Sequence, residues 1–99
     1  MFTHAVLMRL VDVDGDFHAR VAACVARVRR EVAALISYHY GPNLADRGRG
    51  YDWVVLGVFA SAAAHDAYQV SAAHLELKDL MTPHIAELVV CDLDHGELP

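Results

Sequence analysis

Tyrosine and histidine are the residue types in this chain best suited to acid–base chemistry. Near pH 7 a neutral imidazole can accept a proton from an acidic carbon, and a phenol can donate a hydrogen bond to the carbonyl oxygen that becomes an enolate. Tyr68 and His74 could form such a pair. Their separation of six positions puts them ~240° apart on an unbroken helix. They therefore converge only if the helix ends near Ser71 to Ala73.

Each candidate residue also has a structural interpretation. Buried tyrosines commonly serve as core residues with a hydrogen-bonded hydroxyl, and Tyr68 fits that description. His74 could cap a helix or bind a backbone carbonyl. His4, on an inward strand face, could be a satisfied interior residue. Trp53 is expected to fill the interior and to shape a ligand site. Both interpretations stay open.

The remaining histidines follow no metal-binding motif. They lack HxH, HExxH and a helical i, i+4 pairing with a carboxylate arranged for zinc. We therefore expect no metal and no other cofactor, and surface positions for His18, His39, His65, His84 and His95. The GRG of residues 48–50 lacks the GxGxxG spacing of a dinucleotide site, so a nucleotide-dependent reaction is not expected.

The composition is that of one small, apolar domain. The 99 residues fit a single domain, residues 1–99, and 56% of them are hydrophobic, above the ~45–50% apolar share of ordinary globular domains. A net charge of −5 argues against a nucleic-acid surface, which requires a basic stripe. No apolar run approaches the ~18 residues of a membrane span. We expect a cytoplasmic protein that binds neither nucleic acid nor membrane, with Cys24 and Cys91 as buried, reduced thiols.

Hydrophobic periodicity predicts the element order β-α-β-β-α-β. Period-two segments predict strands at residues 2–11, 35–40, 51–60 and 87–93. An apolar stripe at steps of three and four predicts a first helix from Phe17. Ser61 is the expected N-cap of a second helix, whose pattern is lost near Ser71. A further helical stretch, residues 74–81, stops at Pro83.

This order predicts an α+β, ferredoxin-like fold, in which two helices cover one face of an antiparallel four-stranded sheet. Both sheet faces are apolar. The uncovered face would carry Phe2, Val6, Met8, Tyr51, Trp53, Val55 and Phe59, or the opposite set. Either patch exceeds what soluble monomers usually expose. We therefore expect a twofold homodimer whose stacked sheets enclose a small cavity, lined by Met8, Tyr51 and Trp53. The last residues, 94–99, are expected to fray.

Four stretches in their order and spacing resemble the stress-responsive dimeric α/β-barrel (Dabb) family. They are MFTHAVLMRL (1–10), GPN (41–43), GYDWVVLGVF (50–59) and AYQVSAAH (67–74). The resemblance runs over nearly the whole chain and implies a ferredoxin-like subunit and a dimeric barrel. In a plant branch of polyketide cyclases, a tyrosine and a histidine at the end of the second helix do acid–base work. The matching positions are Tyr68 and His74, and a histidine near the start of the first strand matches His4.

The chain departs from the cyclase branch at three places. The usual His-Pro-Ala-His run is Ser-Ala-Ala-His at residues 71–74. Trp53 stands where that branch has a cavity histidine, and the first helix has no tyrosine. These departures imply a different cavity and a different substrate.

Together these observations predict a cofactor-free barrel that binds a small, apolar, carbonyl-bearing molecule. As a cyclase- or lyase-like enzyme it would use His74 as base, Tyr68 as acid or oxyanion donor, and His4 as a helper. A non-catalytic, stress-responsive binding module is one alternative, which would release its ligand unchanged. A cofactor-free oxygenase-like barrel enzyme is another, which would consume oxygen.

Overall fold

The computed structural model describes residues 1–96 of the chain. Its elements are β1 (Phe2–Leu10), α1 (Gly15–Glu31), β2 (Leu35–Pro42), β3 (Trp53–Phe59), α2 (Ala62–Gln69), α3 (Ala72–Met81), a short 3-10 helix (Thr82–His84) and β4 (Ile85–Asp94). The predicted order is confirmed, with the second helical region divided into α2 and α3. None of the helices among the described residues is both long and apolar enough to cross a membrane.

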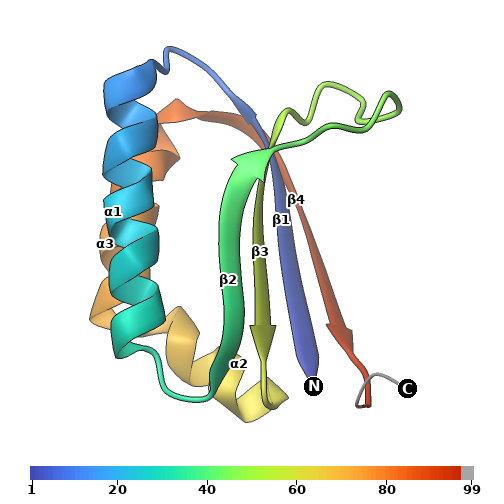
Figure 1. The fold of residues 1–99 in the computed structure, drawn as a ribbon. Coiled ribbons are helices and arrows are strands. Elements are labelled where there is room, and N and C mark those ends of the chain that lie inside the picture. The colour runs from blue at the N-terminus through green and yellow to red at the C-terminus, as the bar shows by residue number, and fades with distance from the viewer. Residues whose placement is uncertain (97–99) are drawn as a thin grey trace.

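The four strands form one antiparallel sheet in the order β2-β3-β1-β4. Figure 1 shows α1 and α3 on one side of this sheet and α2 at its lower end, while the other side carries no helix. This is the ferredoxin-like arrangement that the sequence predicts. β4 lies at the edge of the sheet, beyond the helices, and nearly all of its side chains are exposed.

Helix α1 begins where a cap and an apolar stripe coincide. The Asp14 side chain accepts a hydrogen bond from the Phe17 backbone N–H at 2.9 Å, which satisfies a donor that the first turn leaves free. The stripe facing the sheet is buried and consists of Phe17, Val21, Cys24, Val25 and Val28. Each such side chain contributes roughly 1.5–3 kcal/mol through its removal from water. This packing holds α1 flat on the sheet.

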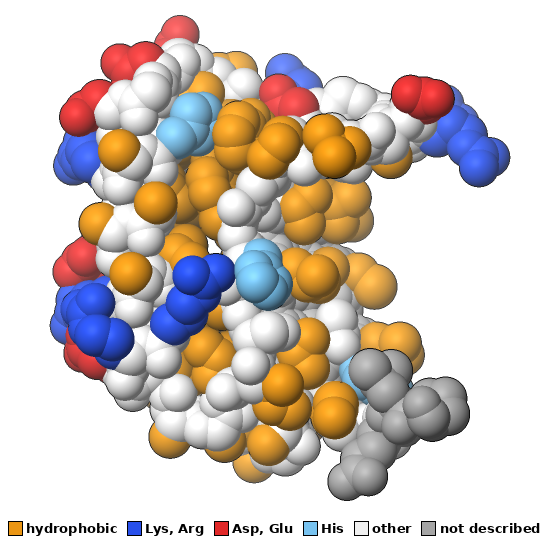
Figure 2. Space-filling view, viewed as in Figure 1, with side chains coloured by type: hydrophobic (Ala, Val, Ile, Leu, Met, Phe, Trp, Pro, Cys, Tyr) orange, Lys and Arg blue, Asp and Glu red, His pale blue; other side chains and the backbone are white. Residues whose placement is uncertain are grey.

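Strand register determines which sheet face the helices cover. His4 and Met8 are buried beneath the helices, so the even-numbered positions of β1 face them. The uncovered face is therefore the second of the two predicted sets, and it carries Ala5, Leu7, Val54, Leu56, Val58, Val89, Cys91 and Leu93. Leu56 is 39% exposed and Leu93 is 59% exposed. Figure 2 shows hydrophobic side chains along this helix-free side.

Two local expectations are wrong. Cys24 is buried as predicted, but Cys91 is exposed because it lies on the uncovered face of the edge strand β4. The predicted fraying does not extend to Asp94, which ends β4, or to His95, whose backbone N–H donates to the Met1 carbonyl at 2.8 Å. The last part of that predicted segment, residues 97–99, lies outside the described residues.

Candidate functional site

One row of residues crosses the helix-covered face of the sheet from edge to edge. In the strand register Tyr38 pairs with Gly57, Gly57 with His4, and His4 with Asp92. Residues directly opposite each other in an antiparallel ladder point to the same face. A Cβ at Gly57 would lie 2.9 Å from the Phe59 ring and 3.1 Å from the Tyr38 ring. The missing side chain therefore lets the Tyr38 ring approach β3 closely.

A break between α2 and α3 brings Tyr68 and His74 together. Helix α2 ends at Gln69, and Ser71 caps α3 by accepting a hydrogen bond from the His74 backbone N–H at 3.2 Å. The Ser71 hydroxyl donates to the Tyr68 carbonyl at 2.7 Å. The centroids of the Tyr68 and His74 rings are 4.5 Å apart. The sequence predicted that this pair could converge only across such a break.

The hydroxyl groups of Tyr38 and Tyr68 are hydrogen-bonded at 2.5 Å. Both tyrosines are almost fully buried. Burial raises the pKa of Tyr68 to about 12 and raises the pKa of Tyr38 further, so both phenols carry their protons near pH 7. The two hydroxyl groups together carry two protons, but the hydrogen bond between them uses only one. With Tyr38 as the donor in that bond, the Tyr68 proton is available to a ligand.

The tautomer of His74 follows from its hydrogen bond. Its Nδ1 lies 2.9 Å from the Gln69 carbonyl oxygen. A carbonyl can only accept, so Nδ1 carries the proton and Nε2 keeps a lone pair. Burial lowers the pKa of His74, and the charges of His4 and Lys78 lower it as well, against the opposing effect of the Gln69 hydrogen bond. The ring is therefore neutral at pH 7, as a general base requires.

His4 is oriented by a carboxylate. Its Nδ1 lies 2.5 Å from Asp92 Oδ1, and the two residues face each other across β1 and β4. The ring is 4% exposed, whereas Asp92 is exposed to solvent. A carboxylate that accepts from Nδ1–H fixes the ring and directs Nε2 away from it. The His4 and Tyr68 ring centroids are 6.0 Å apart.

These residues surround a cavity of about 250 Å³ between the sheet and α3. Polar groups of the lining come from His4, Tyr38, Tyr68, Gln69, His74, Lys78 and Thr82. Its apolar lining consists of Val6, Met8, Val55, Leu77, Met81, Ile85, Leu88 and Val90. An apolar cavity with a few convergent polar groups is typical of small-molecule sites. Leu88 and Val90 are each 48% exposed, because no helix covers β4 on this side.

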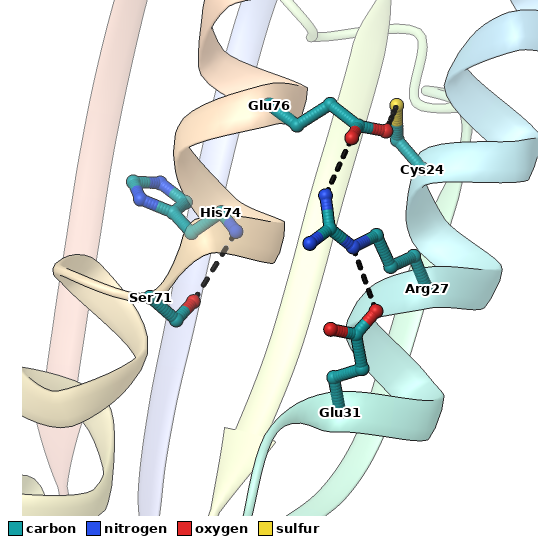
Figure 3. Close-up of polar contacts among 6 residues, drawn as sticks. All are labelled: Cys24, Arg27, Glu31, Ser71, His74 and Glu76. Atoms are coloured by element: carbon teal, nitrogen blue, oxygen red, sulfur yellow. Dashed lines mark hydrogen bonds and ion pairs between the residues drawn. The ribbon is translucent and has the colours of Figure 1, made fainter.

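Contacts on the opposite side of α3 fix its position against α1. Glu76 accepts hydrogen bonds from Arg27 and from the Cys24 thiol, and Arg27 also donates to Glu31. Burial, followed by the hydrogen bond to Glu76, raises the pKa of Cys24, so its thiol stays protonated and unreactive. Figure 3 shows Glu76 pointing from α3 toward α1 while His74 points the other way. The network therefore holds the helix that carries His74.

Four of the six residues singled out in the sequence lie on this cavity: His4, Tyr68, His74 and Met8. The expected place of the cavity, between two stacked sheets, is wrong for Met8, because Met8 faces the helices and the cavity lies between the sheet and α3 of one chain. Trp53 and Tyr51 do not belong to its lining. Trp53 begins β3 and stacks on His18 of α1, with ring centroids 4.0 Å apart. Tyr51 precedes that strand in the loop that connects β2 to β3. Both residues lie toward the far end of β3, beyond the row at Gly57.

Three residues near the cavity were not singled out in the sequence. Tyr38 and Asp92 each lie within a predicted strand. Only the strand register places Tyr38 opposite Gly57 and Asp92 opposite His4. His65 was expected at the surface, which is wrong, because it is 5% exposed. Its ring stacks on Phe2, with centroids 4.5 Å apart. A helical stripe of His65, Tyr68 and Gln69 at steps of three and four was the available signal.

The chain is similar in fold to several solved structures. A dimeric ferredoxin-like protein of unknown function from Thermobifida fusca is 22% identical, with 93% of this chain and 88% of that one covered and a TM-score of 0.79. A protein from Arabidopsis thaliana is 18% identical, with 100% and 99% covered and a TM-score of 0.83. A hydroxynitrile lyase from Passiflora edulis is 18% identical, with 99% and 96% covered and a TM-score of 0.81. At these identities the likeness shows the fold alone.

Sequence comparison gives the family directly. A search of the curated proteins gives no match. The family model described as the stress responsive A/B barrel domain, Dabb, matches residues 2–95, nearly the whole chain. The resemblance inferred from the four sequence stretches is thereby confirmed, and this chain belongs to the Dabb family.

Proposed function

We propose that this chain is a small-molecule-binding Dabb barrel that catalyses proton transfer at a carbon next to a carbonyl group. The observation that carries the proposal is the convergence of a neutral His74 and a protonated Tyr68 on one apolar cavity. A base with a free lone pair and a phenolic donor are the two groups that enolate formation requires.

In the proposed reaction, Nε2 of His74 removes the α-proton of a bound carbonyl compound. The electrons of the broken C–H bond form the C=C bond of an enolate, and negative charge moves to the oxygen. The Tyr68 O–H donates a hydrogen bond to that oxygen, with Tyr38 fixing the phenol. His4, held by Asp92, offers a second ring nitrogen at the cavity. The proton returns to carbon from His74, or the enolate carbon attacks a second carbonyl group in the same molecule. In that case the π bond of the second carbonyl breaks, and its oxygen takes the proton from His74.

The cavity restricts the substrate to a compact, largely apolar molecule. Its volume of about 250 Å³ lies just below the ~300–1,000 Å³ of pockets for drug-sized ligands. Lys78 follows His74 by one helical turn and contributes the one formally charged amine of the lining. An amine at that position favours a substrate with a negatively polarised oxygen at one end.

The proposal includes a homodimer formed through the uncovered sheet face. The apolar residues of that face would be removed from water by an equivalent face at roughly 10 Å. Twofold symmetry lets one patch serve both partners. The similar protein from Thermobifida fusca is described as dimeric and ferredoxin-like, which supports this assembly.

The reaction can be tested without knowing the natural substrate. Acetophenone in D₂O exchanges its methyl protons for deuterium when a base forms the enolate, and NMR measures the exchange rate. We expect the protein to accelerate the exchange. His74→Ala should reduce the rate by roughly 10²–10⁴-fold, and Tyr68→Phe by roughly 10²-fold.

His84→Ala is the matched control, because His84 also donates from Nδ1 to a backbone carbonyl, that of Val11, but lies outside the cavity lining. It should exchange like the unaltered protein. Equal rates for His74→Ala and His84→Ala in folded protein would refute the assignment of the base. Acetophenone that binds but is released without deuterium would instead support the non-catalytic binding module.

A further inference from the structure

A second cluster of polar side chains lies beside the cavity. His4, His65 and Asp92 each bring one potential ligand atom to a common point, and these atoms all lie within 4.8 Å of one another. The three residues come from β1, α2 and β4, respectively. Figure 1 shows that the start of β1, the end of β4 and helix α2 share one end of the sheet. The fold, and not the local sequence, brings them together.

The two imidazoles of this cluster are unusually buried for polar groups. His4 is 4% exposed and His65 is 5% exposed, and their ring centroids are 4.5 Å apart. His65 is also enclosed by the rings of Phe2 and Phe59. The only hydrogen bond of its side chain within the described residues joins Nε2 to the Gln69 side-chain amide at 3.2 Å. Buried histidines of this kind are usually paired with hydrogen-bond partners or bind a metal ion.

The donor atoms of the cluster also suit a cation. Each imidazole offers a ring nitrogen, and Asp92 adds a carboxylate on the exposed side of the cluster. A metal ion binds these groups in their deprotonated forms.

We infer that His4, His65 and Asp92 form a binding site for a divalent transition-metal ion of the zinc class. Two imidazoles and one carboxylate are a ligand set typical of zinc and related ions, with the remaining positions open for water or a ligand. Magnesium and calcium prefer sites made of oxygen atoms alone. The site departs from the sequence-based expectation of no cofactor, because its residues lie far apart in the chain and follow no motif.

The geometry requires a small adjustment on binding. Zinc bonds of about 2.1 Å in a tetrahedral arrangement place ligand atoms roughly 3.4 Å apart. The distance of 2.5 Å from His4 Nδ1 to Asp92 Oδ1 is shorter than this separation. The ligand atoms of the cluster as a whole lie within 4.8 Å of one another, a bound that is longer than this separation. Asp92 is exposed and can retreat by rotation of its side chain. The ion would replace the proton that His4 and Asp92 otherwise share.

Calorimetric titration of the tag-free chain of 99 residues with ZnCl₂ tests the site. We expect one Zn²⁺ per chain. Asp92→Asn and His65→Gln should each weaken binding about 10-fold or more. Asp94→Asn is the matched control, because Asp94 lies two positions further along the same strand on the same face and is also exposed. It should bind Zn²⁺ unchanged, and MgCl₂ should give no heat of binding.

Bound Co²⁺ gives a second, spectroscopic measure of the site. Its visible d–d absorption should appear with the unaltered protein and disappear in Asp92→Asn. Circular dichroism and thermal melting check that each variant folds. If His65→Gln fails to fold, the exposed Asp92→Asn decides the question alone. The inference is refuted if the unaltered chain binds no Zn²⁺, if Asp92→Asn binds it undiminished, or if Asp94→Asn weakens binding equally. The titration does not depend on the proposed proton-transfer activity.

Discussion

The hydroxyl oxygens of Tyr38 and Tyr68 lie 2.5 Å apart, one on β2 and the other on α2, and both side chains are almost fully buried. The bond ties the sheet to helix α2, whose last turn carries Tyr68 and which ends just before the helix that carries His74. Burial without a partner is costly for a hydroxyl group. The pair is therefore both a structural link and the support of the proposed oxyanion donor.

A double-mutant cycle measures this link. Tyr38→Phe and Tyr68→Phe should each lower the free energy of unfolding by ~1–3 kcal/mol, because each leaves one buried hydroxyl without its partner. The double variant should lose less than the sum of the two, by about 0.5–3 kcal/mol. Urea denaturation followed by circular dichroism gives these values. Strictly additive losses would show that the two hydroxyls are not coupled.

The pH dependence of deuterium exchange should reflect the lowered pKa of His74. Only the neutral ring accepts a proton, so activity is lost as pH falls through this pKa, below the ordinary imidazole value of about 6.5. On the alkaline side the Tyr68 phenol keeps its proton to a pKa of about 12. After subtraction of hydroxide catalysis, the rate should be flat from about pH 7.5 to 10. An acidic limb centred above pH 7 would contradict the assignment.

Gly57→Ala should disturb the cavity without touching the candidate catalytic residues. The new Cβ would lie 2.9 Å from the Phe59 ring and 3.1 Å from the Tyr38 ring, so one of the rings must move. We expect a loss of ~1–3 kcal/mol in the free energy of unfolding and a slower deuterium exchange. Gly41→Ala on β2 is the control, since nothing lies within 4 Å of a Cβ there. Equal melting temperatures for the two variants would mean that the sheet accommodates the methyl group.

The proposed dimer predicts that one charge on the uncovered sheet face separates the subunits. Leu56→Glu introduces a carboxylate at the middle of that face, where it would be buried against the partner sheet. Leu75→Glu is the control, because Leu75 is 46% exposed on α3 and Leu56 is 39% exposed. Sedimentation at micromolar concentration should find a dimer for Leu75→Glu and a monomer of 10.9 kDa for Leu56→Glu. If the unaltered chain sediments as a monomer, the proposed dimeric barrel is ruled out.

Most of the fold could be predicted because local patterns specify it. The predicted N-cap Ser61 caps α2 in the structure, and the predicted loss of helical pattern near Ser71 coincides with the break between α2 and α3. Which sheet face the helices cover could not be decided, since both faces are apolar. The register that pairs His4 with Asp92 and Tyr38 with Gly57 is a long-range property, and it determined the cavity lining.

The candidate site was predicted in part. The break at Ser71 let the sequence place His74 against Tyr68. Trp53 was expected in the cavity because it stands where the cyclase branch has a cavity histidine, but the cavity does not extend to that end of β3. His65 was assigned to the surface because it follows no motif, although α2 turns it inward. The cytoplasmic location stays a prediction.

The account depends on a neutral His74 that presents an unprotonated Nε2 to the cavity. Long-range ¹H–¹⁵N NMR of histidine-labelled protein at pH 7 distinguishes the two tautomers and the charged ring, and loss of the signal in His74→Gln assigns it. We predict a proton on Nδ1, bonded to the Gln69 carbonyl, and a lone pair on Nε2 whose chemical shift changes when acetophenone is added. A proton on Nε2, or a fully protonated ring, would contradict the account.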